Sequence, residues 1–116
     1  MSRFSGAWRQ SDDKAVASLI ARDGATIETS DGRLGPLGPR QAAAVLRALF
    51  EGRATKNVRT RQMQDVGGSP QRAYAEVIWT ALAPETNQPM RVVVFVEWMV
   101  DEDKTWRITR IRLLTP

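Results

Sequence analysis

The fold is decided by the stretch Lys104-Thr105-Trp106-Arg107-Ile108-Thr109-Arg110-Ile111-Arg112-Leu113-Leu114 near the end of the chain. Trp106 and Ile108 share one phase of a two-residue period, whereas Ile111 and Leu113 share the other. A strand keeps all four on one face only if it gains an extra residue near Thr109-Arg110, which is a β-bulge. Because bulges bend strands, the sequence predicts a strongly curved sheet, with Trp106 in its core.

The segments that precede this strand also have the pattern of strands. They run over residues 58–66, 72–82 and 90–100, and the turns Gly67–Pro70, Pro84–Pro89 and Asp101–Lys104 separate them. The segment 72–82 places Ala73, Ala75, Val77, Trp79 and Ala81 on one face. Consecutive strands joined by short turns favour an antiparallel meander over alternating βαβ units.

The first half of the chain is mostly helical in pattern. Residues 3–10 and 12–22 carry apolar side chains at helical spacing, and Ser11–Asp13 offers N-cap candidates. A short strand is expected at 25–29, followed by a turn. Gly35–Pro39 breaks regular structure before a helix that starts at Pro39 and ends at Phe50. We therefore expect an α+β fold, with N-terminal helices packed on the curved antiparallel sheet, in one domain spanning residues 1–116.

Composition excludes several kinds of site. The 116 residues contain no cysteine and no histidine, which removes disulfides, thiolate nucleophiles and imidazole ligands. Any catalysis would have to use carboxylate, Tyr, Lys or Arg side chains. We expect no metal site and no cofactor, and we favour a role other than that of an enzyme.

Charge and hydropathy say less about partners. The formal net charge is +4, but the cations are scattered from Arg3 to Arg112, so we interpret them as a solvated surface. No apolar run approaches the ~20 residues of a membrane span. Met1–Phe4 lacks the apolar core of a signal peptide. We expect a cytoplasmic protein by default, or the mature part of an exported protein whose leader is absent from this chain.

Two carboxylates on the predicted strands are candidate ligand-binding residues. Glu97 interrupts an apolar run, where a carboxylate is costly unless it is paired or its pKa rises. It could act as an acid, a base or an anchor for a cationic ligand, but a cross-strand salt bridge to Arg107, Arg110 or Arg112 is favoured. Glu76 is a weaker case, with Tyr74 and Ile78 as neighbours on the same face.

Aromatic side chains supply the other candidates. Trp8 and Trp98 could line a pocket for a flat apolar ligand or could belong to the core, and the sequence leaves both readings open. The set of candidate ligand-binding residues is therefore Trp8, Tyr74, Glu76, Glu97 and Trp98, and no catalytic residue is assigned.

The strand at 90–100 is apolar on both faces, with Val92, Val94 and Val96 on one side and Val93 and Phe95 on the other. In a single-layered α+β domain of this size, the helices can cover only one face of the sheet. We expect the second face to be covered by another copy of the chain, sheet against sheet, in an isologous homodimer. The alternative cover is a small apolar or anionic ligand.

The strand arginines allow a further possibility. Arg59, Arg61, Arg110 and Arg112 alternate on strands that could be neighbours, and such a strip could bind anions or RNA. No aromatic residue interleaves them in sequence, so we do not expect nucleic acid as a partner.

The whole pattern resembles the nuclear transport factor 2-like superfamily, the cone-shaped fold of ketosteroid isomerase and certain polyketide cyclases, and is most similar to small bacterial members of unassigned function. The segments that carry the resemblance span nearly the whole chain: Asp12-Asp13 before Val16-Leu19-Ile20, Asp23-Gly24-Ala25, the helix Gln41–Phe50, Gly67-Gly68, Ala75 and Trp106-Arg107-Ile108. The resemblance implies a pocket at the open end of a cone. The Asp base and the Tyr/Asp pair of the isomerases match no positions here.

These observations favour a homodimeric, non-catalytic domain that binds a small molecule or serves as an accessory domain. The alternative is an isomerase- or cyclase-like enzyme that uses Glu97 or Glu76 as a buried base. An anion- or RNA-binding module is the third possibility.

Overall fold

The computed structural model describes residues 2–69, 71–83 and 85–114. Pro70 and Pro84, which the sequence assigned to turns, lie outside the described residues. The elements follow in the order α1 (Ser2–Arg9), α2 (Asp13–Ala17), β1 (Ala25–Thr29), β2 (Gly32–Leu37), α3 (Pro39–Phe50), β3 (Ala54–Gly67), β4 (Arg72–Leu82), β5 (Pro89–Val100) and β6 (Trp106–Leu114).

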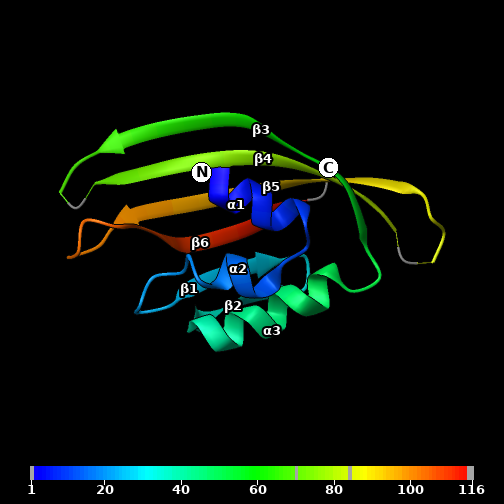
Figure 1. The fold of residues 1–116 in the computed structure, drawn as a ribbon, viewed down its shortest axis with the longest axis horizontal. Coiled ribbons are helices and arrows are strands. Elements are labelled where there is room, and N and C mark those ends of the chain that lie inside the picture. The colour runs from blue at the N-terminus through cyan, green and yellow to red at the C-terminus, as the bar shows by residue number, and fades with distance from the viewer. Residues whose placement is uncertain (1, 70, 84, 115–116) are drawn as a thin grey trace.

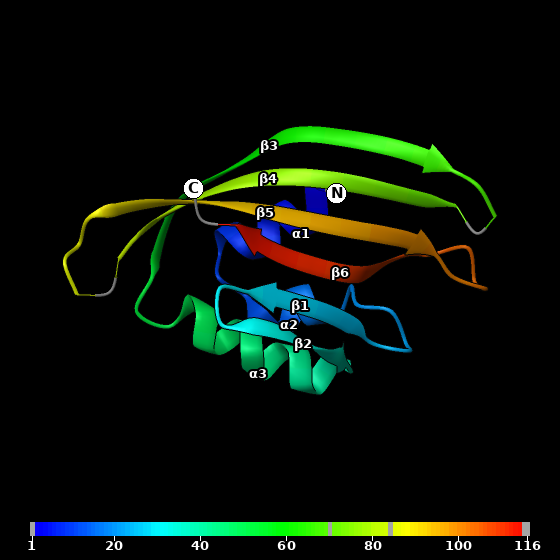
Figure 2. The same cartoon turned by 180° about the vertical axis from the view of Figure 1, so that it is seen from behind.

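All of these strands form one sheet, in the spatial order β2-β1-β6-β5-β4-β3. Every pair is antiparallel except β1 with β6, which run parallel. The long strands arch over α1, α2 and α3, which all lie on one side of the sheet (Figure 1). Figure 2 shows the opposite side, which we call the outer face, with no helix across it. The α+β class and the curved antiparallel sheet are thus confirmed.

The predicted β-bulge in the last strand is present. Ile111 pairs with Val96 and Ile108 pairs with Trp98, while the register shifts between them and leaves Thr109 as the extra residue. The Thr109 hydroxyl donates to the carbonyl of Glu97 across the bulge at 3.3 Å. Because of this slip, Ile108 and Ile111 both point to the helices and both are 0% exposed.

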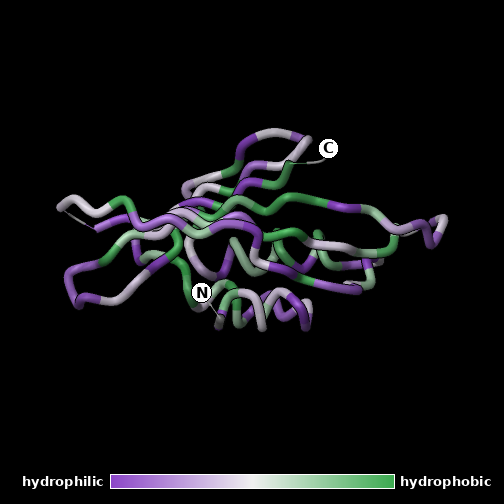
Figure 3. Tube along the Cα trace, turned by 90° about the horizontal axis from the view of Figure 1, so that it is seen from above, coloured by the Kyte–Doolittle hydropathy of each residue, from purple (hydrophilic) through white to green (hydrophobic). Residues whose placement is uncertain are grey.

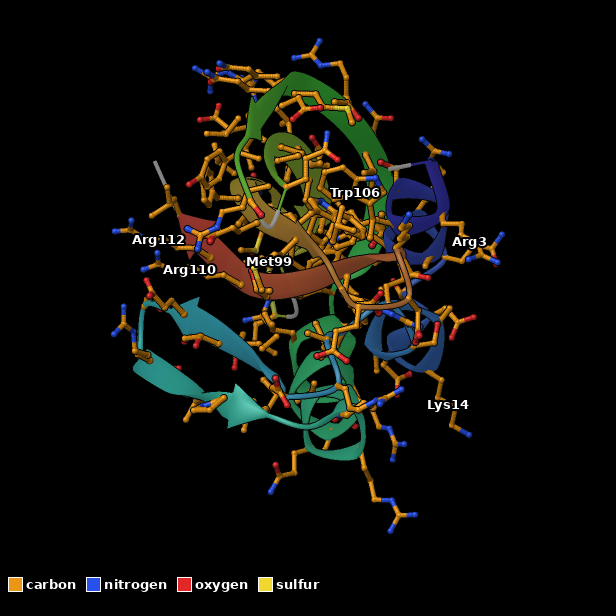
Figure 4. All side chains as sticks on the ribbon, turned by 90° about the vertical axis from the view of Figure 1, so that its left-hand side faces the viewer. Arg3, Lys14, Met99, Trp106, Arg110 and Arg112 are labelled. Atoms are coloured by element: carbon orange, nitrogen blue, oxygen red, sulfur yellow. The ribbon has the colours of Figure 1, made fainter. Side chains whose placement is uncertain are left out.

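The prediction that Trp106 is a core residue is wrong. Trp106 has the same phase as Ile108, but it pairs with Val100, the last residue of β5 and two residues beyond Trp98. Its side chain is 38% exposed at this end of the core, on the side of the sheet that α1 covers (Figure 4).

The second helix is shorter than predicted, because it ends at Ala17 rather than near Arg22. Its start is as expected, with the Asp12 carboxylate accepting from the Ala15 amide. The residues after it bond to the sheet instead of continuing the helix. The Ile108 amide donates to the Leu19 carbonyl at 2.8 Å, and the Ala21 amide donates to the Ile108 carbonyl at 2.9 Å. Tertiary pairing outcompetes the local helical pattern.

The sequence also missed β2, since Gly35–Pro39 was expected to lack regular structure. Strand Gly32–Leu37 instead pairs with β1, and a cis peptide bond joins Gly35 to Pro36. At the other edge of the sheet, β3 is longer than predicted and is exposed along most of its length. Its register with β4 shifts at three places.

The core lies between the helices and the sheet. The hydropathy-coloured trace shows hydrophobic runs along the strands and hydrophilic loops toward the ends of the long axis (Figure 3). In the part of the chain that the structure describes, no helix has the length and apolar content needed to cross a membrane.

Candidate binding surface

The predicted ligand-binding residues separate onto the two sides of the sheet. Trp8 and Trp98 point into the core, where they are 0% and 7% exposed. Tyr74, Glu76 and Glu97 lie on the outer face, because their neighbours on β4 and β5 alternate with them into the core. These residues therefore cannot form one site within a single copy of the chain.

The core-facing residues belong to an aromatic cluster. The Trp8 ring lies 5.4 Å from Phe4, 4.9 Å from Phe50 and 5.4 Å from Trp79, and Phe4 continues the contacts to Trp98 at 6.0 Å. The Trp79 indole donates to the Thr55 hydroxyl at 2.9 Å. The Trp8 indole nitrogen, in contrast, is buried and has no partner among the described residues.

The outer face has an aromatic centre. The rings of Tyr74 and Phe95 stack at 5.4 Å with an interplanar angle of 29°. Ile78 and Val93 pair beside them on β4 and β5. A depression of about 160 Å³ adjoins the aromatic pair, lined by Gln62, Gln64, Tyr74, Ala75, Glu76 and Phe95. Tyr74 and Glu76, two predicted ligand residues, are thus brought together here.

The predicted salt bridge of Glu97 is not formed among the described residues. Glu97 and Arg110 are direct register partners on β5 and β6, as the prediction required. However, the Arg110 guanidinium turns to Glu28 on the other neighbouring strand, at 2.6 Å. Glu76 instead lies 3.7 Å from Arg61.

Glu28, which sequence reasoning missed, is the centre of a group of three arginines. Its Oε1 atom accepts from Nε and Nη2 of Arg110 at 3.2 and 2.6 Å and from Nε of Arg33 at 3.0 Å. Its Oε2 atom lies 3.3 Å from Nε of Arg112. The hydrogen bonds from Arg110, and next those from Arg33, lower the pKa of Glu28, and the bond to Glu28 raises the pKa of Arg110.

The predicted strip of strand arginines is wrong in its geometry. Arg59 and Arg61 lie on β3, while Arg110 and Arg112 lie on β6, and β4 and β5 separate the two pairs. Although no aromatic residue interleaves these arginines in sequence, aromatic side chains do lie between them in three dimensions. Tyr74 on β4 and Phe95 on β5 stand on the outer face between the two pairs.

The outer face consequently has an aromatic and apolar centre with basic flanks. Register places Arg33, Arg59, Arg91, Arg110 and Arg112 on this face, together with Glu28, Glu76 and Glu97. Figure 4 shows Arg110 and Arg112 extending from β6 on the side away from α1, beside β1 and β2. In the described residues no group of three or more Asp or Glu side chains is placed to hold a metal ion.

Comparison with known proteins identifies the architecture. No protein-family model and no curated protein matches the chain. A DUF4783 family protein from Bacteroides uniformis superposes with a TM-score of 0.82 at 11% identity, covering 99% of this chain and 95% of that one. A domain of unknown function with a cystatin-like fold from Nostoc punctiforme gives 0.75 at 15% identity, covering 99% and 72%. A ketosteroid isomerase-like protein from Erwinia carotovora atroseptica gives 0.76 at 18% identity, covering 99% and 91%. The chain has the nuclear transport factor 2-like fold.

The interior of this nuclear transport factor 2-like cone is largely filled. A hollow of about 70 Å³ remains beside Trp79, with Leu49, Arg53 and Leu113 also in its wall. Pockets that bind drug-sized molecules enclose about 300–1,000 Å³. A larger hollow of about 420 Å³ lies at the sheet end between residues 21–23 and the β5–β6 turn. That volume is within the ligand-binding range, but charged residues such as Arg22, Asp101 and Arg107 line much of its wall, and none of the clustered aromatic rings does.

Proposed function

We propose that the chain is a non-catalytic accessory domain that works as a homodimer, paired through the outer face of its sheet. The observation that carries this proposal is an apolar and aromatic centre of that face that no helix covers, in which Tyr74, Val93 and Phe95 are half-buried and Ile78 is buried beside them. Every helix of the described residues lies on the opposite side (Figures 1 and 2). Aromatic and apolar centres surrounded by polar groups are typical of association surfaces.

A second copy is the partner that the face fits best. An isologous interface sets the same patch against itself, so its apolar centre meets an apolar centre. Sheets that pack face to face bury alternate side chains of both layers, which is the pattern that β4 and β5 present.

The enzymatic alternative has less support. Glu76 and Glu97, its candidate bases, lie on the open outer face, and the Glu76 side chain is 32% exposed beside Arg61. A general base works within reach of a bound substrate, in a site that limits water. The ketosteroid isomerase-like neighbour shares the fold with this chain, but its catalysis is not carried over because no catalytic position is matched.

The mass of the protein in solution tests the proposal. Wild-type chain should sediment as a dimer at micromolar concentration and shift toward one-chain mass on dilution. Phe95→Arg should move the equilibrium to the monomer, because it removes the stacked ring from the centre of both faces and leaves there a charge that the interface would have to bury twice. Met63→Gln is the matched control, since Met63 is 62% exposed on β3 with its side chain on the helix-bearing side.

One-chain mass for the wild type across the whole dilution range would contradict the proposal. So would a Phe95→Arg variant that remains folded by near-ultraviolet circular dichroism and still dimerises like the Met63→Gln control.

A further inference from the structure

We infer that Arg33, Arg110 and Arg112, held together by Glu28, form a binding site for a small ligand that carries phosphate groups. We call these four residues the arginine clamp. The clamp lies on the flank of the outer face, where β2, β1 and β6 meet, and not in its apolar centre. The observations behind the inference are the contacts with Glu28, and none of them depends on the proposed dimer.

The clamp is preorganised by one recessed carboxylate. The Glu28 side chain is 16% exposed, whereas those of Arg33, Arg110 and Arg112 are 66%, 32% and 49% exposed. Arginine side chains in solution are flexible, and ordering them costs conformational entropy when an anion binds. Here bonds to Glu28 already bring three guanidiniums together, so an incoming anion finds them assembled.

The guanidiniums keep donors for a ligand. Each has five N–H groups in a planar fork, and the contacts with Glu28 use Nε and Nη2 of Arg33, Nε and Nη2 of Arg110, and Nε of Arg112. Among the described residues, Nη1 of all three makes no hydrogen bond. Planar forks with free donors match the paired oxygens of a phosphate.

The local charge also favours an anion. Three cations surround a single carboxylate, so the clamp itself carries a surplus of positive charge. Glu97, the register partner of Arg110, is the other carboxylate that faces it from β5 and reduces this surplus without cancelling it. Arg33 and Arg112 contact different oxygens of the Glu28 carboxylate, so we expect a ligand with two adjacent anionic groups to gain most.

Isothermal titration of the full chain with inorganic pyrophosphate, at constant ionic strength set with sodium chloride, tests the inference. Arg33→Gln and Arg112→Gln should each weaken binding by roughly tenfold, the loss expected for one charge-assisted contact. The double variant should weaken binding by roughly a hundredfold, because the two losses add in free energy. Arg59→Gln is the matched control, because it removes one exposed charge from the same face on β3 and should change affinity little.

Arg33→Lys separates geometry from charge, since it keeps the cation but loses the fork and should also weaken binding. Circular dichroism of each variant checks that β1 and β2 remain folded. The inference is overturned if wild-type protein takes up no pyrophosphate. It is equally overturned if Arg59→Gln and the double variant lose affinity to the same extent, because pyrophosphate would then be sensing only net charge. The sedimentation test of the dimer is separate, so either idea can fail alone.

Discussion

At the residue scale, the two central tryptophans of the core differ by one hydrogen bond. Trp8 and Trp79 are 0% and 1% exposed and contact one another edge to face. Trp79 donates to Thr55, whereas the Trp8 indole has no partner among the described residues. A buried N–H without a partner loses its bonds to water and gains none in return.

This difference predicts unequal effects of the same substitution. Trp8→Phe and Trp79→Phe remove a similar volume, but only Trp79→Phe removes a hydrogen bond. We expect Trp79→Phe to lower the free energy of unfolding by roughly 1 kcal/mol more than Trp8→Phe does. Urea denaturation of both variants measures it, and a larger loss for Trp8→Phe would show that its indole has a bound partner such as water.

The pKa of Glu28 gives a second prediction at this scale. Its hydrogen bonds to Arg110 and Arg33 lower its pKa below the ordinary 4.5. A carboxylate whose pKa is lower in the folded protein stabilises it above the ordinary value, and that stabilisation is lost as pH falls through the lowered pKa. Stability should therefore fall on acidification below 4.5 more steeply in the wild type than in Glu28→Gln.

Guanidinium denaturation at a series of acidic pH values provides the measurement. Glu85→Gln serves as a control, because Glu85 is exposed and forms no ion pair with any described residue. Identical pH profiles for wild type and Glu28→Gln would contradict the prediction.

At the element scale, the bulge in β6 keeps two isoleucines in the core. Deleting Thr109 would remove the bulge and give regular pairing with β5, with Ile108 and Ile111 then two positions apart and both still facing the helices. The deletion therefore removes the bend and the Thr109 hydrogen bond but keeps both core contacts, and it should cost less than the about 1.5–3 kcal/mol of exposing one isoleucine. Thr109→Ala leaves the backbone unchanged and should cost below about 1.5 kcal/mol, the net value of one hydrogen bond.

Thermal denaturation of both variants checks this prediction. Thr109→Ala should stay close to wild type, and the deletion should be less stable but should still unfold cooperatively. A deletion variant that loses cooperative unfolding would contradict this prediction and would mean that β6 needs the bend to meet both β1 and residues 19–21.

The same elements show which structural features could be predicted from sequence. The bulge was predictable because its signature, a change of phase between Ile108 and Ile111, is local. The end of α2 was not, because residues 19–21 leave their helical pattern to bond with Ile108, far along the chain. Strand β2 has mostly exposed side chains and contains Gly35 and Pro36, so no hydrophobic alternation marks it.

At the scale of the whole molecule, the candidate site depends on sheet order, which the sequence did not specify. Tyr74, Glu76 and Glu97 lie together on the outer face, and their separation from Trp8 and Trp98 follows from which face the helices cover. Glu28 escaped notice because two of its three partners, Arg110 and Arg112, come from the parallel pairing of β1 with β6. The packing of the interior could not be predicted from the sequence either, because it arises where aromatic residues of α1, α3, β4 and β5 meet in space.

The basic flanks of the outer face predict how the proposed dimer responds to salt. Arg59 and Arg91 lie outside the apolar centre, so two copies bring like charges near one another. Salt screens such repulsion. We therefore expect the dimer dissociation constant to fall as sodium chloride rises, with a smaller response in the double variant Arg59→Gln/Arg91→Gln.

Sedimentation equilibrium at several salt concentrations measures this response. A dissociation constant that rises with salt in the wild type would indicate that ion pairs across the interface outweigh the repulsion between flanks.

The free edge formed by β3 has a consequence for how the protein behaves in a crowded solution. An unpaired strand of 14 residues offers a long row of amides and carbonyls on which a foreign strand could grow, the first step toward fibrils. Its register breaks against β4 twist this row out of line, and Lys56, Arg59 and Arg61 place charge along it. Strand addition at this edge is thereby discouraged, and β3 remains the last strand of the sheet.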